Sequence, residues 1–249
     1  MSVLLNLFLS IFVGVLWMLF VYRMDRYEPE PVKKIILVFL LGGLAAVPAA
    51  MLEAKLNTPL KIIFTTYSVP YTLSLYLLIV GPVEEFVKFF IVHITIFRKK
   101  EFNEPIDGII YSSASSLGFA TAENFVYLNR FGSSLILFRG PLTTLAHILF
   151  SMLWGYALGE GKFHPKESFF ARPVNGLILA AAAHGTYNFF LYPKELFGWS
   201  KGVQYASAVM VLVLMVTLWF ILMKHIKKMN LESPFKPLSL SKKRKSPIP

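Results

Sequence analysis

The sequence predicts an all-α protein, a polytopic bundle of about seven transmembrane helices. Hydrophobic residues make up 55% of the 249 residues, charged residues make up 16%, and the mean hydropathy is +0.59. Soluble proteins carry roughly 25% charged residues, so this composition excludes an ordinary soluble enzyme, a disordered regulator and a free nucleic-acid-binding protein. The chain contains no cysteine. A disulfide framework, a zinc ribbon and a thiol nucleophile are therefore excluded as well.

Apolar stretches of the length that a bilayer requires, about 20 residues, recur along the chain. The first lacks a basic start and a small-residue cleavage site, so we interpret it as a retained helix rather than a signal peptide. Short connections favour antiparallel neighbours, and a break in the third stretch would raise the count to eight. We expect spans at residues 2–22, 35–52, 71–97, 105–128, 140–159, 173–192 and 203–223.

Lysine and arginine are distributed unequally between alternate connections. Eighteen lie on one side and 6 on the other, and the remaining cation, Lys88, lies inside a predicted span. The positive-inside rule then places the N-terminus outside and the C-terminus in the cytoplasm. The net charge of +11 is therefore a topology signal, and it does not indicate a nucleic-acid partner. We divide the chain into a membrane domain, residues 1–224, and a basic tail, residues 225–249, whose Lys-rich end can rest on anionic lipid.

Several ionisable side chains occupy the predicted spans, where each costs roughly 2.5–3.5 kcal/mol on insertion scales. A helical rise of about 1.5 Å per residue places those of four spans at one level in the outer leaflet. We therefore expect them to meet in one polar pocket near the external face. They are Glu84, Glu85 and Lys88 in the third span, Glu123 in the fourth, His147 in the fifth and His184 in the sixth.

The third span has a helix breaker just before its two acids. Pro82 lacks an N–H, so we expect a break or kink, with Pro82 at the first position of a new helix. Glu84 and Glu85 then lie in the first turn and point about 100° apart. One can face the site while Lys88, three and four residues on, holds the other. The alternative is a buried ion-pair cluster that only fixes helix packing.

Polar residues at helical spacing accompany these acids. The fifth span carries a stripe at i+4 steps, Arg139, Thr143, His147 and Ser151, and the sixth carries His184 and Asn188. Small residues at 112–118 and at Gly42-Gly43 allow close helix packing. The alternatives are an interfacial position for Glu123 and packing roles for the histidines. We interpret the other histidines, at 93, 164 and 225, as structural or surface residues.

This set of side chains suits hydrolysis of a peptide bond. A carboxylate whose pKa is shifted towards neutrality can activate water as a general base. Imidazole and amide groups can donate hydrogen bonds to an oxyanion. The same Glu and His groups could instead hold a metal ion with an open position for water. The sequence contains no HExxH, no GxSxG and no paired aspartates. The usual zincin, serine and aspartyl protease arrangements are therefore unsupported.

Several motifs in order resemble those of the PrsW family of bacterial intramembrane proteases, from the first loop to the sixth span. They are residues 25–31 (DRYEPEP), 84–88 (EEFVK), 118–124 (GFATAEN), the stripe 139–147 and residues 184–189 (HGTYNF). The family is related to the type II CAAX prenyl endopeptidases, whose motifs are EExxxR, FxxxH and HxxxN. In this chain Lys88 lies one position before the arginine of the first motif, and Glu123 stands where the second has histidine.

The resemblance implies a multi-pass protease of the bacterial cell membrane. Its implied reaction is site-1 cleavage of a membrane-anchored anti-sigma factor on the extracytoplasmic side, which releases an envelope-stress sigma factor. It also implies that Glu84 activates water and that His184 and Asn188 stabilise the oxyanion. The candidate catalytic residues are Glu84, Glu85, Glu123, His147, His184 and Asn188, with Lys88, Asn124 and Arg139 in support. The implied partners are this protein substrate and the lipid bilayer, with no nucleic acid and no small-molecule cofactor.

We expect a metal-free glutamate mechanism first, and a divalent metal such as zinc is the alternative. Its ligands would be Glu84, Glu123, His147 and His184. Two other classes of function stay open. One is a proton- or ion-coupled transporter, because buried acids and broken helices are common in transporters. The other is a non-catalytic scaffold or a prenyl-protein processor. The absence of a visible inverted repeat and the off-centre acids weigh against a transporter.

Overall fold

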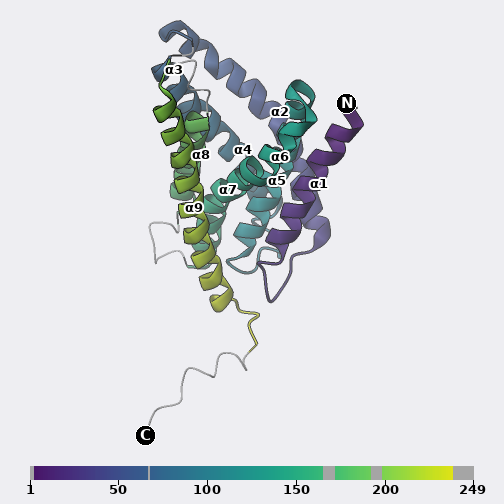
Figure 1. The fold of residues 1–249 in the computed structure, drawn as a ribbon. Helices are drawn as coiled ribbons and strands as arrows, with labels where there is room; N and C mark the ends of the chain where they lie inside the picture. The colour runs from purple at the N-terminus through teal and green to yellow at the C-terminus, as the bar shows by residue number, and fades with distance from the viewer. Residues whose placement is uncertain (1–2, 67, 165–171, 192–197, 238–249) are drawn as a thin grey trace.

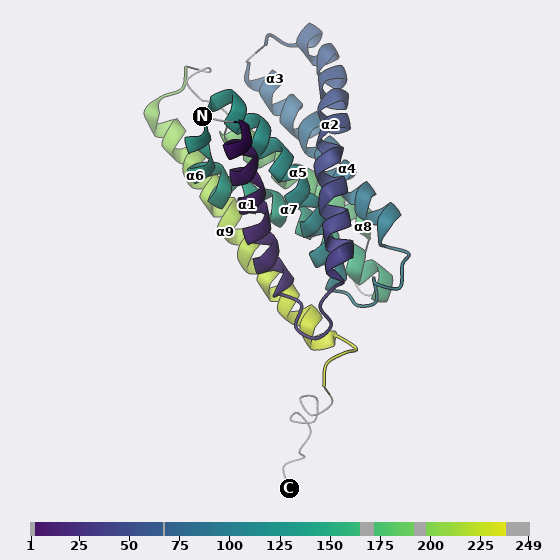
Figure 2. The ribbon, with the colours of Figure 1, turned by 90° about the vertical axis from the view of Figure 1, so that its right-hand side faces the viewer.

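A computed structural model describes residues 3–66, 68–164, 172–191 and 198–237. Within these residues the chain forms helices and no strands, so the all-α prediction is confirmed. Consecutive long helices run in alternating directions (Figures 1 and 2). They are α1 (Val3–Tyr22), α2 (Val32–Ile63), α3 (Val69–Ser74), the π-helix η1 (Leu75–Val80), α4 (Gly81–Thr95), α5 (Asp107–Phe131), the 3-10 turn η2 (Ser133–Leu135), α6 (Ile136–Phe138), the π-helix η3 (Arg139–Thr143), α7 (Thr144–Phe163), α8 (Pro173–Leu191) and α9 (Lys201–Glu232).

Four helical stretches are long and apolar enough to cross a membrane. They are residues 3–22, 32–63, 133–163 and 201–232. The other expected spans are also helical, but α5 consists largely of small and polar residues buried in the interior, and the third is divided into α3, η1 and α4. The number of crossings and the direction of the termini stay predictions. The basic run at 242–245 lies outside the described residues.

The expected break before the two acids of the third span takes another form. The chain stays helical at Gly81, with φ −55° and ψ −53°. The six residues before it, Leu75–Val80, form a π-helix, and Pro82 occupies the first turn of α4 as predicted. A π-helical segment shifts the hydrogen-bonding register, which is one way in which a helix accommodates a residue without an N–H. The chain therefore passes from η1 into α4 without a gap, and the choice between seven and eight spans stays a prediction.

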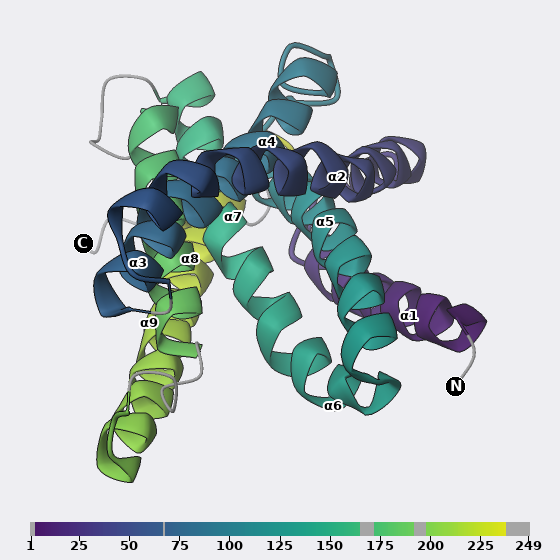
Figure 3. The same ribbon diagram turned by 90° about the horizontal axis from the view of Figure 1, so that it is seen from above.

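Helix α5 lies at the centre of the bundle, with α1, α2 and α7 packed against it (Figure 3). Glycines bring α2 and α5 into backbone contact. The sequence predicted close packing at both sites, and the structure shows that the two sites pack against each other. A Cβ atom on Gly42 would overlap the carbonyl oxygen of Ser115, and one on Gly118 would overlap that of Phe39. This contact fixes α2 closely beside α5.

The outer faces of α1, α2 and α9 carry large apolar side chains. Leu4, Leu44 and Phe220 are among those exposed. Soluble monomers rarely expose contiguous apolar surface of this extent, so these faces suit contact with lipid. The apolar core lies inside, around α5 and α7 and the buried side chains of Tyr111 and Trp154.

Four acidic side chains are buried at the end of the bundle where the 23–31 connection lies. Asp25, Glu30, Glu104 and Asp107 are each at most 5% exposed. The Tyr111 hydroxyl donates a hydrogen bond of 2.5 Å to Glu30. In the described part of the chain no lysine or arginine forms an ion pair with these four. Burial therefore raises the pKa of Glu30 and that of Glu104 to about 7.

Glu104→Gln should stabilise the protein at alkaline pH. The pKa of Glu104 rises from 4.5 to about 7 on folding. The protonated carboxyl group therefore contributes its full stabilisation below about pH 4.5, and this stabilisation is lost as the group ionises while the pH rises through 7. Glutamine keeps the shape of the side chain and does not titrate. A pKa rise of this size corresponds to about 3 kcal/mol at pH 8, and about 1 kcal/mol moves the unfolding temperature of a chain of this size by about 2–4 °C. We therefore expect a clearly higher unfolding temperature at pH 8 and little change at pH 4.5, measured in detergent. Glu101→Gln, which removes the partner of Lys34 at 3.5 Å, is the control and should give no increase; an equal increase would contradict the explanation.

Gly42→Ala should destabilise the bundle, because the added methyl group would overlap the Ser115 carbonyl oxygen. Overpacking of this kind costs about 1–3 kcal/mol. The matched control is Gly202→Ala in α9, where the nearest contact of an added Cβ is 3.8 Å away. Thermal unfolding of both variants should show a loss for the first and no loss for the second. Equal unfolding temperatures would mean that the α2–α5 contact tolerates a wider spacing.

Candidate active site

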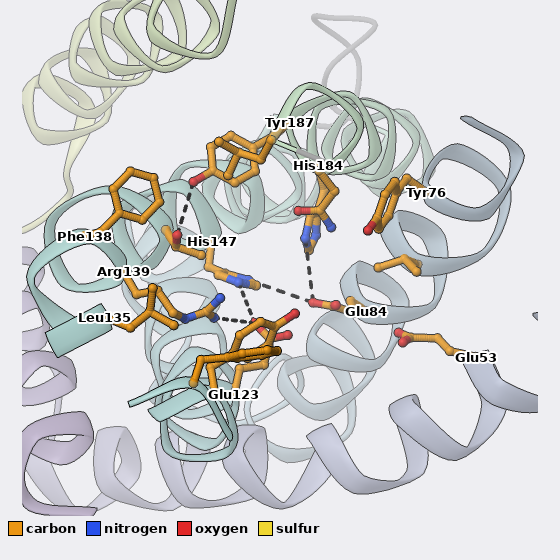
Figure 4. Close-up of a pocket in the computed structure, with 16 residues that line it drawn as sticks. Glu53, Tyr76, Glu84, Glu123, Leu135, Phe138, Arg139, His147, His184 and Tyr187 are labelled. Atoms are coloured by element: carbon orange, nitrogen blue, oxygen red, sulfur yellow. Dashed lines mark hydrogen bonds and ion pairs between the residues drawn. The ribbon is translucent and has the colours of Figure 1, made fainter. Parts of the chain in front are cut away.

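A cavity of about 620 Å³ opens among α2, η1, α4, α5, α7 and α8 (Figure 4). It lies towards the end of the bundle where α1 begins, opposite the buried acids of the 23–31 connection. Most of the candidate residues line it, and Tyr76, Tyr127 and Tyr187 add polar aromatic walls. The candidates on its surface are Glu84, Glu123, Arg139, His147, His184 and Asn188.

Glu84 and two histidines converge at the floor of the cavity. The Oε2 atom of Glu84 lies 3.8 Å from Nε2 of His184 and 3.9 Å from Nδ1 of His147. One potential ligand atom from each of the three side chains lies within 4.8 Å of the others. All three residues are at most 4% exposed. The structure thus brings together side chains from α4, α7 and α8 that are far apart in the sequence.

Each of these histidines is held by a carboxylate at its other ring nitrogen. Glu85 Oε1 lies 2.9 Å from Nδ1 of His184, and Glu123 Oε2 lies 2.9 Å from Nε2 of His147. These carboxylates orient the rings and leave the remaining nitrogens directed at Glu84. Metal-binding histidines almost always donate their other ring N–H to a carboxylate, a backbone carbonyl or a water, and here both have a carboxylate.

Glu85 is fully buried and does not line the cavity. Its Oε2 accepts hydrogen bonds from the Ser151 hydroxyl at 2.8 Å and the Trp154 indole at 3.0 Å. Its Oε1 accepts a hydrogen bond from Lys88 at 2.9 Å. The two adjacent acids are therefore divided as the helix geometry predicted, with Glu84 facing the cavity and Glu85 held behind it.

Lys88 connects the buried groups. Its ammonium lies 3.1 Å from Glu84 Oε2, 2.9 Å from Glu85 Oε1 and 3.1 Å from Nδ1 of His147. It also lies 4.4 Å from the ring centroid of Phe119. Lys88 is fully buried, so its charge offsets the charge of the acids without screening by bulk water.

Arg139 and Asn124 hold Glu123 in place. Nε of Arg139 donates to Oδ1 of Asn124 at 2.7 Å, and its Nη2 lies 3.3 Å from Glu123 Oε2. The guanidinium also stacks over the Tyr127 ring, 3.9 Å from its centroid. Glu123, which we counted among the potential metal ligands, instead lies behind His147, at the ring nitrogen that faces away from Glu84.

The polar stripe of the fifth span serves several parts of the site. Arg139 lies in the π-helix η3, whose wider turn alters the i+4 spacing expected from the sequence. Thr143 accepts a hydrogen bond from Tyr187 at 3.4 Å, and Ser151 reaches Glu85. Asn188 lines the cavity beside His184 on α8.

The other histidines lie away from the cavity. His93 stacks between Phe89 and Phe97, and His225 packs on Tyr156 with the ring centroids 4.2 Å apart. His164 lies 3.7 Å from Glu160. These contacts agree with the structural or surface roles that we expected.

The sequence interpretation missed Glu53, which reaches the cavity from α2. We ended that span at Leu52, but α2 continues to Ile63 through Pro48 and Pro59. Residues 53–58 (EAKLNT) are mostly polar, so hydropathy did not predict that the helix continues after Leu52. Of the three cavity tyrosines, Tyr187 lies within the motif 184–189 (HGTYNF), whereas Tyr76 and Tyr127 lie in none of the quoted motifs.

The converging donors fit a divalent metal ion. Two imidazoles and one carboxylate form a common catalytic zinc set that leaves one position for water. Lys88 supplies a positive charge to the same donors at 3.1 Å. A metal ion would therefore share Glu84 and His147 with this ammonium, while the carboxylates behind both histidines orient their rings towards the same point.

Comparison with known proteins agrees with this geometry. The family described as "PrsW family intramembrane metalloprotease" matches residues 30–221. A relative named Protease PrsW from Geobacillus kaustophilus is 33% identical over 86% of this chain and 88% of its own length. Its namesake from Clostridioides difficile is 31% identical over 96% and 94%, and that from Bacillus subtilis is 29% identical over 86% and 91%. No solved structure gives a significant match. The chain therefore belongs to the PrsW family of intramembrane metalloproteases and is a membrane-embedded protease.

Proposed function

We propose that this protein hydrolyses a peptide bond of a membrane-anchored protein in the cavity above Glu84, and that Glu84, His147 and His184 hold a divalent metal ion there. The observation that most strongly supports this proposal is the convergence of the three side chains, with a carboxylate 2.9 Å from the other ring nitrogen of each imidazole. A carboxylate in this position fixes the ring and raises the basicity of the ligand nitrogen.

The proposed substrate is a membrane-anchored anti-sigma factor, cut first on the extracytoplasmic side of the plasma membrane so that an envelope-stress sigma factor is released. Two observations support this proposal. The motifs follow the order of the PrsW family. The cavity reaches the end of the bundle where α1 begins, since Phe131 lines it and Asn129 on the same helix contacts Asn6 of α1. The distribution of lysine and arginine predicts that this end faces outwards.

The side chains of the cavity have distinct roles in this reaction. Glu84, His147 and His184 would hold the metal ion, which would supply Lewis acidity to the scissile carbonyl and to a water molecule. Asn188, on the cavity wall beside His184, donates hydrogen bonds to the oxyanion. Glu85 and Glu123 position the histidines, and Lys88 positions Glu84.

The metal-free reaction that we expected first uses the same cavity differently. Glu84 itself would take the proton from water, while His184 and Asn188 stabilise the oxyanion. The family description and the paired carboxylate–histidine contacts favour the metal-dependent alternative. No observation favours the transporter or the scaffold over the protease.

Chelation should abolish cleavage by the purified protein. We expect a membrane-anchored anti-sigma factor of Bacillus subtilis to be cleaved in detergent, cleavage to stop with 1,10-phenanthroline, and added zinc to restore it, because the metal activates the water. Glu84→Gln should be inactive with or without zinc. Glu28→Gln, at the opposite end of the bundle, should stay active. Activity that resists the chelator but is lost in Glu84→Gln would establish the metal-free reaction instead.

Glu85→Gln should weaken metal binding although Glu85 is not a ligand. Loss of a carboxylate behind a metal-binding histidine costs about 10–100-fold in affinity or activity. Titration of the apoprotein with zinc, with cleavage as readout, should show this loss. Trp154→Phe removes one of the hydrogen-bond donors to Glu85 and should have a smaller effect. Zinc affinity equal to that of the original protein in Glu85→Gln would contradict the positioning role.

A further inference from the structure

The glutamates around the cavity differ in how they are held. Glu84 contacts Lys88 and lies near both histidines. Glu85 is held by four side chains, those of Lys88, Ser151, Trp154 and His184. Glu123 pairs with His147 and Arg139. In contrast, Oε1 of Glu53 is buried and has no hydrogen-bond partner among the described residues. No ion pair within the described ranges includes Glu53.

Glu53 lines the same cavity as the converging donors. Figure 4 shows its carboxyl group directed from α2 towards Glu84. One turn further along α2, Asn57 accepts a hydrogen bond of 3.0 Å from the Tyr71 hydroxyl, and Gly42 fixes the other part of α2 against α5. Glu53 is therefore held by its helix rather than by partners of its own side chain.

A carboxylate without partners can gain and lose a proton without breaking existing contacts. Glu84 is occupied when it serves as a ligand, and Glu85 and Glu123 are occupied in holding the histidines. Among the four glutamates, Glu53 is thus the one suited to proton transfer.

We infer that Glu53 carries the proton of peptide hydrolysis, an assignment that rests on the proposed function. As the water oxygen bonds to the carbonyl carbon, one water proton passes to the Glu53 carboxylate. As the C–N bond breaks, Glu53 returns this proton to the leaving nitrogen and the carbonyl double bond re-forms. The second water hydrogen stays on the new carboxyl group, which releases it to solvent. Glu53 is regenerated as a carboxylate.

The test compares Glu53→Gln, Glu53→Asp and Lys55→Gln, cleaving the Bacillus subtilis anti-sigma factor in detergent. Loss of a general acid–base group lowers the rate about 10²–10⁴-fold, so Glu53→Gln should lose kcat by this factor with KM and zinc content unchanged. Glu53→Asp keeps the titratable group and should recover part of kcat. Lys55→Gln, an exposed change two residues away on the same helix, should match the original protein. An unchanged kcat in Glu53→Gln, or a rise in KM alone, would overturn the inference.

A second measurement needs no substrate. Hydrophobic carbodiimides react with protonated carboxyl groups, and mass spectrometry locates the adduct. We expect labelling at Glu53 ahead of Glu84, Glu85 and Glu123, whose carboxylates are held by cations or hydrogen bonds. No labelling at Glu53 would overturn the inference even if the protein cleaves its substrate. Labelling at Glu53 without any cleavage of the anti-sigma factor would count against the proposed function and support an exchangeable proton at this residue.

Discussion

Compensation of buried charge around Lys88 is the constraint on which the site depends. A lone ammonium or carboxylate at this depth would be strongly destabilising, and removing one partner of a buried pair costs more than the pair contributes. Lys88 meets this constraint by contacting Glu84, Glu85 and His147 within 3.1 Å. Because these groups belong to α4 and α7, and Glu85 in turn holds His184 on α8, the charge network also fixes how three helices pack.

The helical framework supplies the positions that this network needs. Backbone contact at Gly42 and Gly118 sets α2 beside α5, so that Glu53 and Glu123 face one cavity. Two π-helical segments, η1 and η3, precede the helices that carry Glu84 and His147. π-Helical turns are often found at functional sites because they redirect side chains that a regular helix would place elsewhere.

The sequence predicted the helical class and the convergence of Glu84, His147 and His184 because charges in apolar spans have few stable positions other than a shared interior. The motif spacing also predicted that Glu84 and Glu85 would have separate roles. Glu53 could not be found in this way, because the end of α2 depended on how Pro48 and Pro59 are accommodated. The position of Glu123 behind His147 depends on ring orientation, which tertiary hydrogen bonds determine and sequence spacing does not.

The charges around the cavity also bear on what the site holds. Four acids, Glu53, Glu84, Glu85 and Glu123, surround two permanent cations, Lys88 and Arg139. With neutral histidines this leaves a surplus of two negative charges in an environment that screens them poorly. A divalent ion between Glu84 and the histidines would balance this surplus, and a proton on Glu53 would balance half of it. During hydrolysis the proton must arrive at the cavity and leave it. With a divalent ion bound the charges are balanced, so a proton on Glu53 adds one positive charge and can stay there only transiently.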